Sequence, residues 1–148
     1  MDALDTGLST KDIPVSSTSG AGVLRVMVVE DNEALAQTTG WLIEMLGYDY
    51  KLASSAQQAL DQVSAYAPHV MMLDIGLPGM TGYDLCRRLR ADPDLADTTF
   101  IAQTGWGESE HRRLTAEAGF HHHLVKPVYV EALQDLLERI DSERLSKS

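Results

Sequence analysis

The sequence predicts an α/β fold, an open and doubly wound parallel sheet with helices on both faces. Five short apolar segments alternate with five segments whose apolar residues recur at helical spacing. The first and third apolar segments are almost wholly apolar, as expected of central parallel strands that are covered on both faces. The length of 148 residues suits one domain of ordinary size. We therefore expect one α/β domain.

The predicted elements follow one another in strand–helix order. Helix boundaries are marked by Gly47 at an expected C-cap, by Ser54 or Ser55 at an N-cap and by Pro68 as a stop. The second strand alternates polar and apolar residues, as an edge strand does, so we place the first and third side by side. The predicted strands are residues 23–29, 48–53, 70–74, 99–104 and 122–125, and the predicted helices are 33–48, 56–67, 83–91, 109–119 and 130–143.

Both ends of the chain are predicted to lie outside the folded domain. Residues 1–22 are rich in Ser, Thr, Gly and Asp without periodicity, which is typical of a disordered tail. The domain is expected over residues 23–142, and residues 143–148 are expected to form a C-terminal tail. No segment has the pattern of a signal peptide or the roughly 18 apolar residues of a membrane span. We therefore expect a cytoplasmic protein.

The charge and cysteine content exclude several functions. The formal net charge is −10, and no basic stripe is present, so nucleic acid and anionic membranes are poor partners. Cys86 is the only cysteine, which rules out an internal disulfide and thiolate zinc clusters. An acidic balance fits a protein partner, a cation or neither, and net charge alone does not choose among them.

Acidic residues follow the two strands that are predicted to be central. Asp74 ends the third strand, and Glu30 and Asp31 follow the first. Ligands of doubly wound sheets bind outside the carboxyl ends of the strands at the switch point, which here lies between these two strands. Carboxylates that converge repel one another unless a cation or proton lies between them. Hard oxygen ligands of this kind predict a Mg²⁺ site.

Two further polar residues end the next strands on the same edge. Thr104 ends the fourth strand and Lys126 follows the fifth. A hydroxyl and an ammonium beside a carboxylate–metal site are suited to binding the oxygens of a transferred phosphoryl group. A cis peptide bond is possible between Lys126 and Pro127.

The chain resembles the receiver domain of two-component response regulators. The similar segments are "VMVVEDN", "VMMLDIGLPGMTGYDLCRRLR", "FIAQTGWG" and "AGFHHHLVKPV", which occur in the family's order and spacing over residues 23–142. The resemblance implies a flavodoxin-like sheet with strand order 2-1-3-4-5. The last two segments are most similar to receivers of hybrid sensor kinases, whereas the initial Met and the long N-terminal segment favour a stand-alone receiver.

The resemblance implies that Asp74 is the phosphoacceptor. A histidine kinase or a histidine phosphotransfer protein would donate the phosphoryl group, Thr104 and Lys126 would contact its oxygens, and output would pass to a downstream protein target. It also implies that Mg²⁺ is held by Asp31 and Asp74, by the Gly76 carbonyl and by Glu30 through metal-bound water. Such a chain is a signalling receiver rather than an enzyme, although it promotes its own phosphorylation and dephosphorylation.

One position departs from the family pattern. His123 lies three residues before Lys126, where receivers usually carry Tyr or Phe, and the resemblance assigns it with Thr104 to the conformational switch. Alternation along the strand places His122 on the opposite face from its neighbours, so we expect packing rather than metal binding from the histidine run. Trp41 is expected in the core or on the helix surface, and Trp106 in loop packing, as a lid or in a partner contact.

Two alternatives to a phosphorylatable receiver remain open. The first is a Mg²⁺-dependent phosphohydrolase with an aspartyl-phosphate intermediate, although such enzymes usually carry a second acid where this chain has Gly76. The second is a receiver-like binding module that acts without phosphorylation. The complete set of acids, together with Thr104 and Lys126, argues against that module.

Overall fold

A computed structural model of the chain describes residues 22–105 and 109–147, with residues 109–112 described by their backbone alone. The expected N-terminal tail therefore lies outside the described residues, apart from Gly22. Trp106 lies outside them as well. The predictions for these two regions stay predictions.

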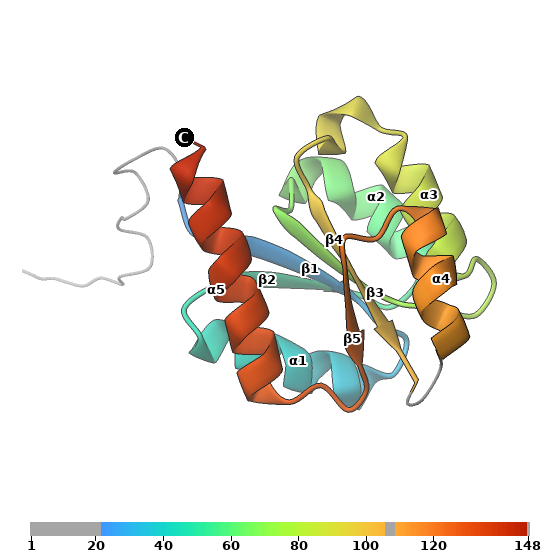
Figure 1. Cartoon of the computed structure of the whole chain (residues 1–148), viewed down its shortest axis with the longest axis horizontal. Helices are drawn as coiled ribbons and strands as arrows, with labels where there is room; N and C mark the ends of the chain where they lie inside the picture. The colour runs from blue at the N-terminus through green and yellow to red at the C-terminus, as the bar shows by residue number, and fades with distance from the viewer. Residues whose placement is uncertain (1–21, 106–108, 148) are drawn as a thin grey trace, which may run out of the picture.

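The sheet is parallel throughout and has the strand order β2-β1-β3-β4-β5. This order confirms the doubly wound fold, with β1 and β3 side by side and β2 at an edge (Figure 1). The strands fall within two residues of the predicted segments at every boundary. They are β1 (Arg25–Val29), β2 (Asp49–Ala53), β3 (Val70–Asp74), β4 (Thr99–Thr104) and β5 (His122–Val125).

Helices cover both faces of the sheet, with α1 and α5 on one face and α2, α3 and α4 on the other (Figure 1). Side-chain oxygens of Asn32, Ser55 and Thr81 accept hydrogen bonds from the first turns of α1, α2 and α3, so local capping sets where these helices begin. The helices are α1 (Glu33–Met45), α2 (Ala56–Tyr66), α3 (Gly82–Arg90), α4 (Ser109–Ala118) and α5 (Val130–Ser146), and a short 3₁₀ turn, η3 (Pro93–Leu95), precedes β4.

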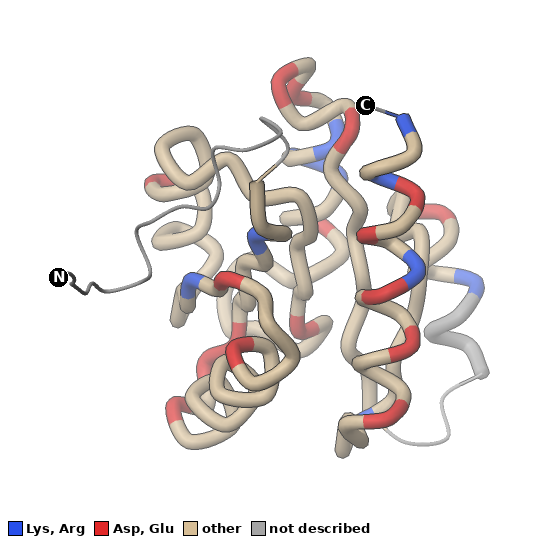
Figure 2. The backbone as a smooth tube through the Cα atoms, turned by 90° about the vertical axis from the view of Figure 1, so that its left-hand side faces the viewer, with Lys and Arg blue, Asp and Glu red and all other residues tan. Residues whose placement is uncertain are grey.

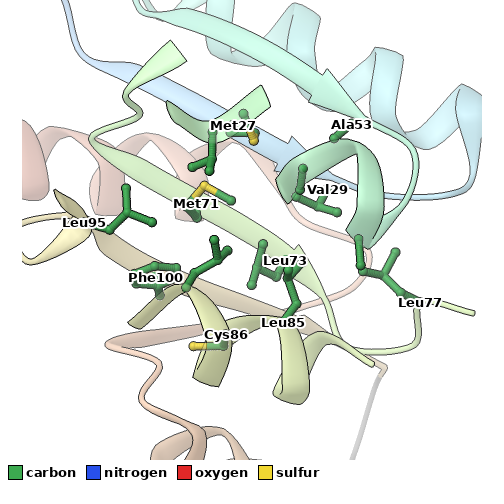
Figure 3. Packing of buried hydrophobic residues seen from close by; sticks show 14 of the residues in the cluster. Met27, Val29, Ala53, Met71, Leu73, Leu77, Leu85, Cys86, Leu95 and Phe100 are labelled. Atoms are coloured by element: carbon green, nitrogen blue, oxygen red, sulfur yellow. The ribbon is translucent and has the colours of Figure 1, made fainter. Parts of the chain in front are cut away.

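Successive residues of the central strands pack into opposite cores. Met27, Val29, Met71 and Leu73 face α2 and α3, as Figure 3 shows for this cluster. The residues between them in the chain are as deeply buried against α1 and α5: Val26, Val28, Val70 and Met72. Because both faces are covered, these strands must be apolar at every position, which explains the two apolar segments in the sequence.

The structure corrects the predicted end of the last helix. Residues 144–146, predicted as part of a C-terminal tail, continue α5 to Ser146. The Arg144 guanidinium donates hydrogen bonds to the Asp141 carboxylate at 2.6 Å and to the Gly22 carbonyl at 3.0 Å. These bonds fix the last turn of α5 against the segment that enters β1, a tertiary contact that helical periodicity does not report.

Two expectations for α1 are also resolved. The helical spacing of apolar residues in the sequence places Leu35 on the apolar face of the predicted helix 33–48, but Leu35 is 38% exposed. Trp41 is 59% exposed, which selects the helix surface over the core. α1 ends at Met45, and Leu46 is its C-cap residue. Gly47, with φ of +97°, therefore lies one residue beyond the C-cap position at which the sequence placed it.

None of the helices in the described part of the chain is both long and apolar enough to cross a membrane.

Candidate functional site

Three carboxylates meet at the carboxyl edge of the two central strands. The register pairs Val29 of β1 with Leu73 of β3, so the residues that follow them, Glu30 and Asp74, are neighbours. Glu30, Asp31 and Asp74 each place a carboxylate oxygen within 4.8 Å of the others. Glu30 is 3% exposed and Asp74 is 7% exposed, whereas Asp31 is exposed to solvent. The sequence-predicted convergence of these acids is therefore present in the fold.

Lys126 places its ammonium between two of these carboxylates. Its Nζ lies 2.9 Å from Oε1 of Glu30 and 3.2 Å from Oδ1 of Asp74. Burial by itself would lower the pKa of Lys126, but the hydrogen bond to Glu30 and the charge of Asp74 outweigh it and raise that pKa above its ordinary value. The ammonium is thus kept charged at the site, and the peptide bond from Lys126 to Pro127 is cis.

The environment of Glu30 opposes its ionisation in part. Burial raises the pKa of the Glu30 carboxyl and the charge of Asp74 adds to the rise, while hydrogen bonds from Lys126 and from the Asn32 amide oppose it. The Asn32 amide donates to Oε2 of Glu30 at 3.1 Å, and the Gly76 amide donates to Oδ1 of Asp74 at 3.0 Å. Three carboxylates beside one ammonium leave an excess of negative charge at the site. Their oxygen atoms are ligands that suit a hard divalent cation.

Thr104 lies at the same edge, at the end of the strand next to Asp74. The β3–β4 register pairs Asp74 with Gln103, so Thr104 is one residue beyond it, and Thr104 is 2% exposed. Its Oγ1 is hydrogen-bonded to Nε2 of His123 on β5, with 2.5 Å between the two atoms. The residues predicted from the strand ends are therefore grouped together, and the assigned switch pair is in direct contact.

The three consecutive histidines divide between the two faces of β5. Nδ1 of His121 accepts a hydrogen bond from the Phe100 amide at 2.9 Å, and the His121 ring stacks on the Phe100 ring. His122 instead interacts electrostatically with Arg139 and Glu143 on α5. The alternation expected from the strand is confirmed, because His122 faces the helix that covers the opposite side of the sheet.

Sequence reasoning missed two residues that shape the site. The sequence assigns no role to Asn32, yet its backbone amide donates a hydrogen bond to the Glu30 carboxylate. A Cβ on Gly82 would lie 2.5 Å from the Asp74 carbonyl oxygen and 2.8 Å from Cα of Ile75, so the start of α3 can approach the end of β3 only because residue 82 is glycine. The Thr81-Gly82 pair marks a helix start in the sequence, but this close approach is a tertiary property.

The family profile described as "Response regulator receiver domain" matches residues 26–139. The transcriptional regulator RpaA of Synechocystis sp. is 31% identical over 127 residues, which cover 79% of this chain and 50% of the relative. The response regulator MprA of Mycobacterium avium is 30% identical over 117 residues, which cover 79% of this chain and 49% of MprA. The chain thus spans about half the length of these curated relatives.

Solved structures agree with this match. A CheY-like receiver domain from Methylobacillus flagellatus is 29% identical with a TM-score of 0.74, over 80% of this chain and 99% of that chain. The receiver domain of a histidine kinase from Syntrophus aciditrophicus is 26% identical with a TM-score of 0.74, over 80% of this chain and 90% of that one. CheY4 of Vibrio cholerae, 24% identical with a TM-score of 0.76 over 80% of this chain and 99% of its own, shares the fold. The chain belongs to the receiver domain family of response regulators.

Proposed function

We propose that the chain is a phosphorylatable receiver in a two-component or phosphorelay pathway and that it accepts a phosphoryl group on Asp74. The observation that carries this proposal is the place of the Asp74 carboxylate, at the carboxyl end of a central strand and 3.2 Å from the Lys126 ammonium. Two further carboxylates lie within 4.8 Å of it. A nucleophile with charge compensation at its side is what phosphoryl transfer to a carboxylate requires.

In the proposed step a carboxylate oxygen of Asp74 forms a bond to phosphorus as the phosphorus–nitrogen bond of a phosphohistidine breaks. The leaving imidazole keeps the bonding electrons and takes up a proton. The donor belongs to a histidine kinase or a histidine phosphotransfer protein. The ammonium of Lys126 and the hydroxyl of Thr104 bind the phosphoryl oxygens and stabilise the charge that they carry. The chain contributes position and electrostatics, which supply most of the catalysis in phosphoryl transfer.

The acidic cluster supports a Mg²⁺ site in the same place. Glu30, Asp31 and Asp74 offer oxygen ligands within 4.8 Å of one another, and Gly76 lies beside Asp74 to offer its carbonyl. One or two carboxylates with several retained waters are the usual Mg²⁺ ligands in phosphoryl-transfer sites. When bound, the cation supplies positive charge that offsets the charge of the transferred group.

The proposed output is a protein–protein interaction with a downstream target in the cytoplasm. A receiver adds charge at one edge of the sheet when it is phosphorylated, and such a local change biases surface elements that a partner recognises. Gly76 occupies the position of the second acid of aspartyl-phosphate hydrolases, which favours the receiver over that alternative. The chain itself promotes transfer from the donor and later hydrolysis of the phosphoaspartate.

Incubation with acetyl phosphate and Mg²⁺ tests the proposal. Intact-mass spectrometry should record the gain of one phosphoryl group that is stable in acid and lost in base. Asp74→Asn should gain none, because the amide is not a nucleophile of comparable strength. Asp94→Asn is the matched control, since Asp94 is an exposed acid on η3, and it should label as the parent does. Equal labelling of the Asp74→Asn variant would remove the assignment.

A further inference from the structure

The contact between Thr104 and His123 adds a hydrogen bond at the position where receivers usually have an aromatic hydrocarbon ring or a phenol. Nε2 of His123 lies 2.5 Å from Oγ1 of Thr104, and both side chains are at least partly buried. Thr104 is at the end of β4, and His123 pairs across to Ala102 in the β4–β5 register. The contact is therefore held by two adjacent strands.

The protons available to this contact allow two arrangements. The Thr104 hydroxyl has one proton, and Nε2 of a neutral imidazole either carries a proton or accepts one. In the first arrangement the hydroxyl donates to a bare Nε2, and its only proton is used. In the second arrangement Nε2–H donates to Oγ1, and the hydroxyl proton is available to another acceptor.

A phosphoryl group on Asp74 distinguishes between the two arrangements. Its oxygens are acceptors, so the Thr104 hydroxyl binds them only as a donor. If the contact with His123 persists, only the arrangement with Nε2–H satisfies both neighbours of the hydroxyl. Burial makes the alternative costly, because a buried hydroxyl oxygen or ring nitrogen left without a partner loses its solvation.

We propose that His123 is a positioning residue for phosphoryl transfer: its Nε2–H holds Oγ1 of Thr104 so that the hydroxyl proton points at the phosphoryl group on Asp74. The inference rests on the proposed phosphorylation of Asp74. Phosphorylation selects the Nε2–H form of the ring, and the histidine reports the state of the site through its proton instead of through a rotation away from Thr104.

The backbone around the contact supports this role. The Lys126 amide donates to the Thr104 carbonyl at 2.8 Å, which fixes the end of β4 against the segment that carries the ammonium. Thr104 is β-branched and 2% exposed, so few side-chain rotamers are open to it. Because the Thr104 hydroxyl cannot move far, the hydrogen bond from His123 determines mainly the direction of the hydroxyl proton.

The first test is spectroscopic and uses the unaltered chain. The ¹⁵N shifts of the His123 ring nitrogens, assigned by comparison with His123→Gln, identify which nitrogen carries the proton. They are recorded with Mg²⁺ alone and then with Mg²⁺ and beryllofluoride, a stable mimic of the phosphoryl group. We expect Nε2 to be protonated in the second state. A bare Nε2 in that state, or a ring that has lost its coupling to Thr104, overturns the proposal.

The second test is a double-mutant cycle on the rate of phosphorylation by acetyl phosphate in saturating Mg²⁺. His123→Phe keeps a ring but removes the donor, and it should slow phosphorylation by about three- to tenfold, the effect of one net hydrogen bond on a rate. His123→Gln has an amide that can replace Nε2–H and should stay within about twofold of the parent. In a Thr104→Val background, His123→Phe should have no further effect.

The outcomes separate this proposal from the proposed function. If the parent chain gains no phosphoryl group on Asp74, both fail. If the parent is phosphorylated but His123→Phe slows the rate equally with Thr104 and with Val at position 104, the ring acts through packing and only the positioning role fails. Circular dichroism and thermal melting of each variant identify any that do not fold, and the spectroscopic test does not depend on them.

Discussion

His69 illustrates how a single buried side chain connects packing to solution conditions. Its Nδ1 accepts a hydrogen bond from the Arg25 amide at 2.9 Å, where β1 begins beside β3. Burial, assisted by the charges of Arg25 and Arg144, lowers the pKa of His69 to about 4. Protonation of Nδ1 would also remove the acceptor of the Arg25 amide, so the folded chain holds this imidazole neutral.

The folded state should therefore lose stability as pH falls from about 6.5 to about 4. Above the unfolded pKa of 6.5 neither state binds this proton, and the contribution of His69 is fully present. Below pH 6.5 the unfolded chain binds a proton at His69 and the folded chain does not, so stability falls until the pH reaches the folded pKa of about 4. In urea titrations across this range, His69→Asn, which keeps an acceptor, should lose less stability than the parent. Parallel curves for the two proteins would contradict the prediction, because their carboxylates titrate alike.

Gly82→Ala should destabilise the chain by about 1–3 kcal/mol and slow phosphorylation of Asp74. The added Cβ would lie 2.5 Å from the Asp74 carbonyl oxygen, a backbone atom that cannot move without shifting the Asp74 side chain. Gly105→Ala is the matched control, since a Cβ there meets no atom of the described residues within 4 Å, and it should change stability by less than about 0.5 kcal/mol. Urea unfolding gives the first quantity, and acetyl phosphate labelling gives the second. Equal stabilities of the two variants would show that the β3–α3 connection tolerates the extra atom.

At the scale of elements, β4 and β5 connect the site to the surface. Thr104 ends β4, and Lys126 follows β5, and the register joins the two strands from Ile101 with His122 to Thr104 with Val125. α4 follows β4 and α5 follows β5 in the chain, so a displacement at the carboxyl ends of these strands is passed on to these two helices. This arrangement favours α4, β5 and α5 as the face whose structure depends on phosphorylation.

Amide hydrogen exchange should therefore change in α4, β5 and the start of α5 when beryllofluoride and Mg²⁺ are added. The Thr104 hydroxyl and the Lys126 ammonium engage the added charge, and their strands transmit the adjustment. Exchange in α2 should stay within error, because α2 follows β2, which lies at the opposite edge of the sheet from β5. Asp74→Asn with the same additions is the control and should show no change. A response confined to α2 would place the partner surface elsewhere.

The elements themselves were predictable to different degrees. β3, β4 and β5 were predicted to the residue, and in β3 the apolar run that precedes Asp74 marks a strand buried on both faces. η3 was missed, since three residues are too few to show a period. The convergence of Glu30, Asp31 and Asp74 followed from strand adjacency, whereas the roles of Asn32, Gly82 and His69 could not be predicted. Each of those depends on atoms that are distant in the sequence and near only in the fold.

At the scale of the whole molecule, the chain is strongly acidic. Its net charge is −10, and Figure 2 shows acidic residues spread over several helices. Dispersed surface acids are screened over about 8–10 Å at physiological salt, so they contribute little at any one point. The three carboxylates of the site are different, because two of them are buried and their repulsion is relieved only in part by Lys126.

Mg²⁺ should consequently raise the global stability of the chain. A ligand that binds only the folded state adds about 2.7 kcal/mol when its free concentration is about 100 times Kd. For a chain of this size that corresponds to a rise in Tm of about 5–10 °C. The expected rise is measured by thermal melting at fixed ionic strength, with NaCl replacing MgCl₂ in the reference, and EDTA should reverse it. Asp31→Asn removes an exposed acid of the cluster and should reduce the shift by at least half, while Asp94→Asn removes another exposed acid, on η3, and should leave it intact. Equal shifts in the two variants would mean that Mg²⁺ acts on the general charge of the molecule and not at the carboxyl edge of β1 and β3.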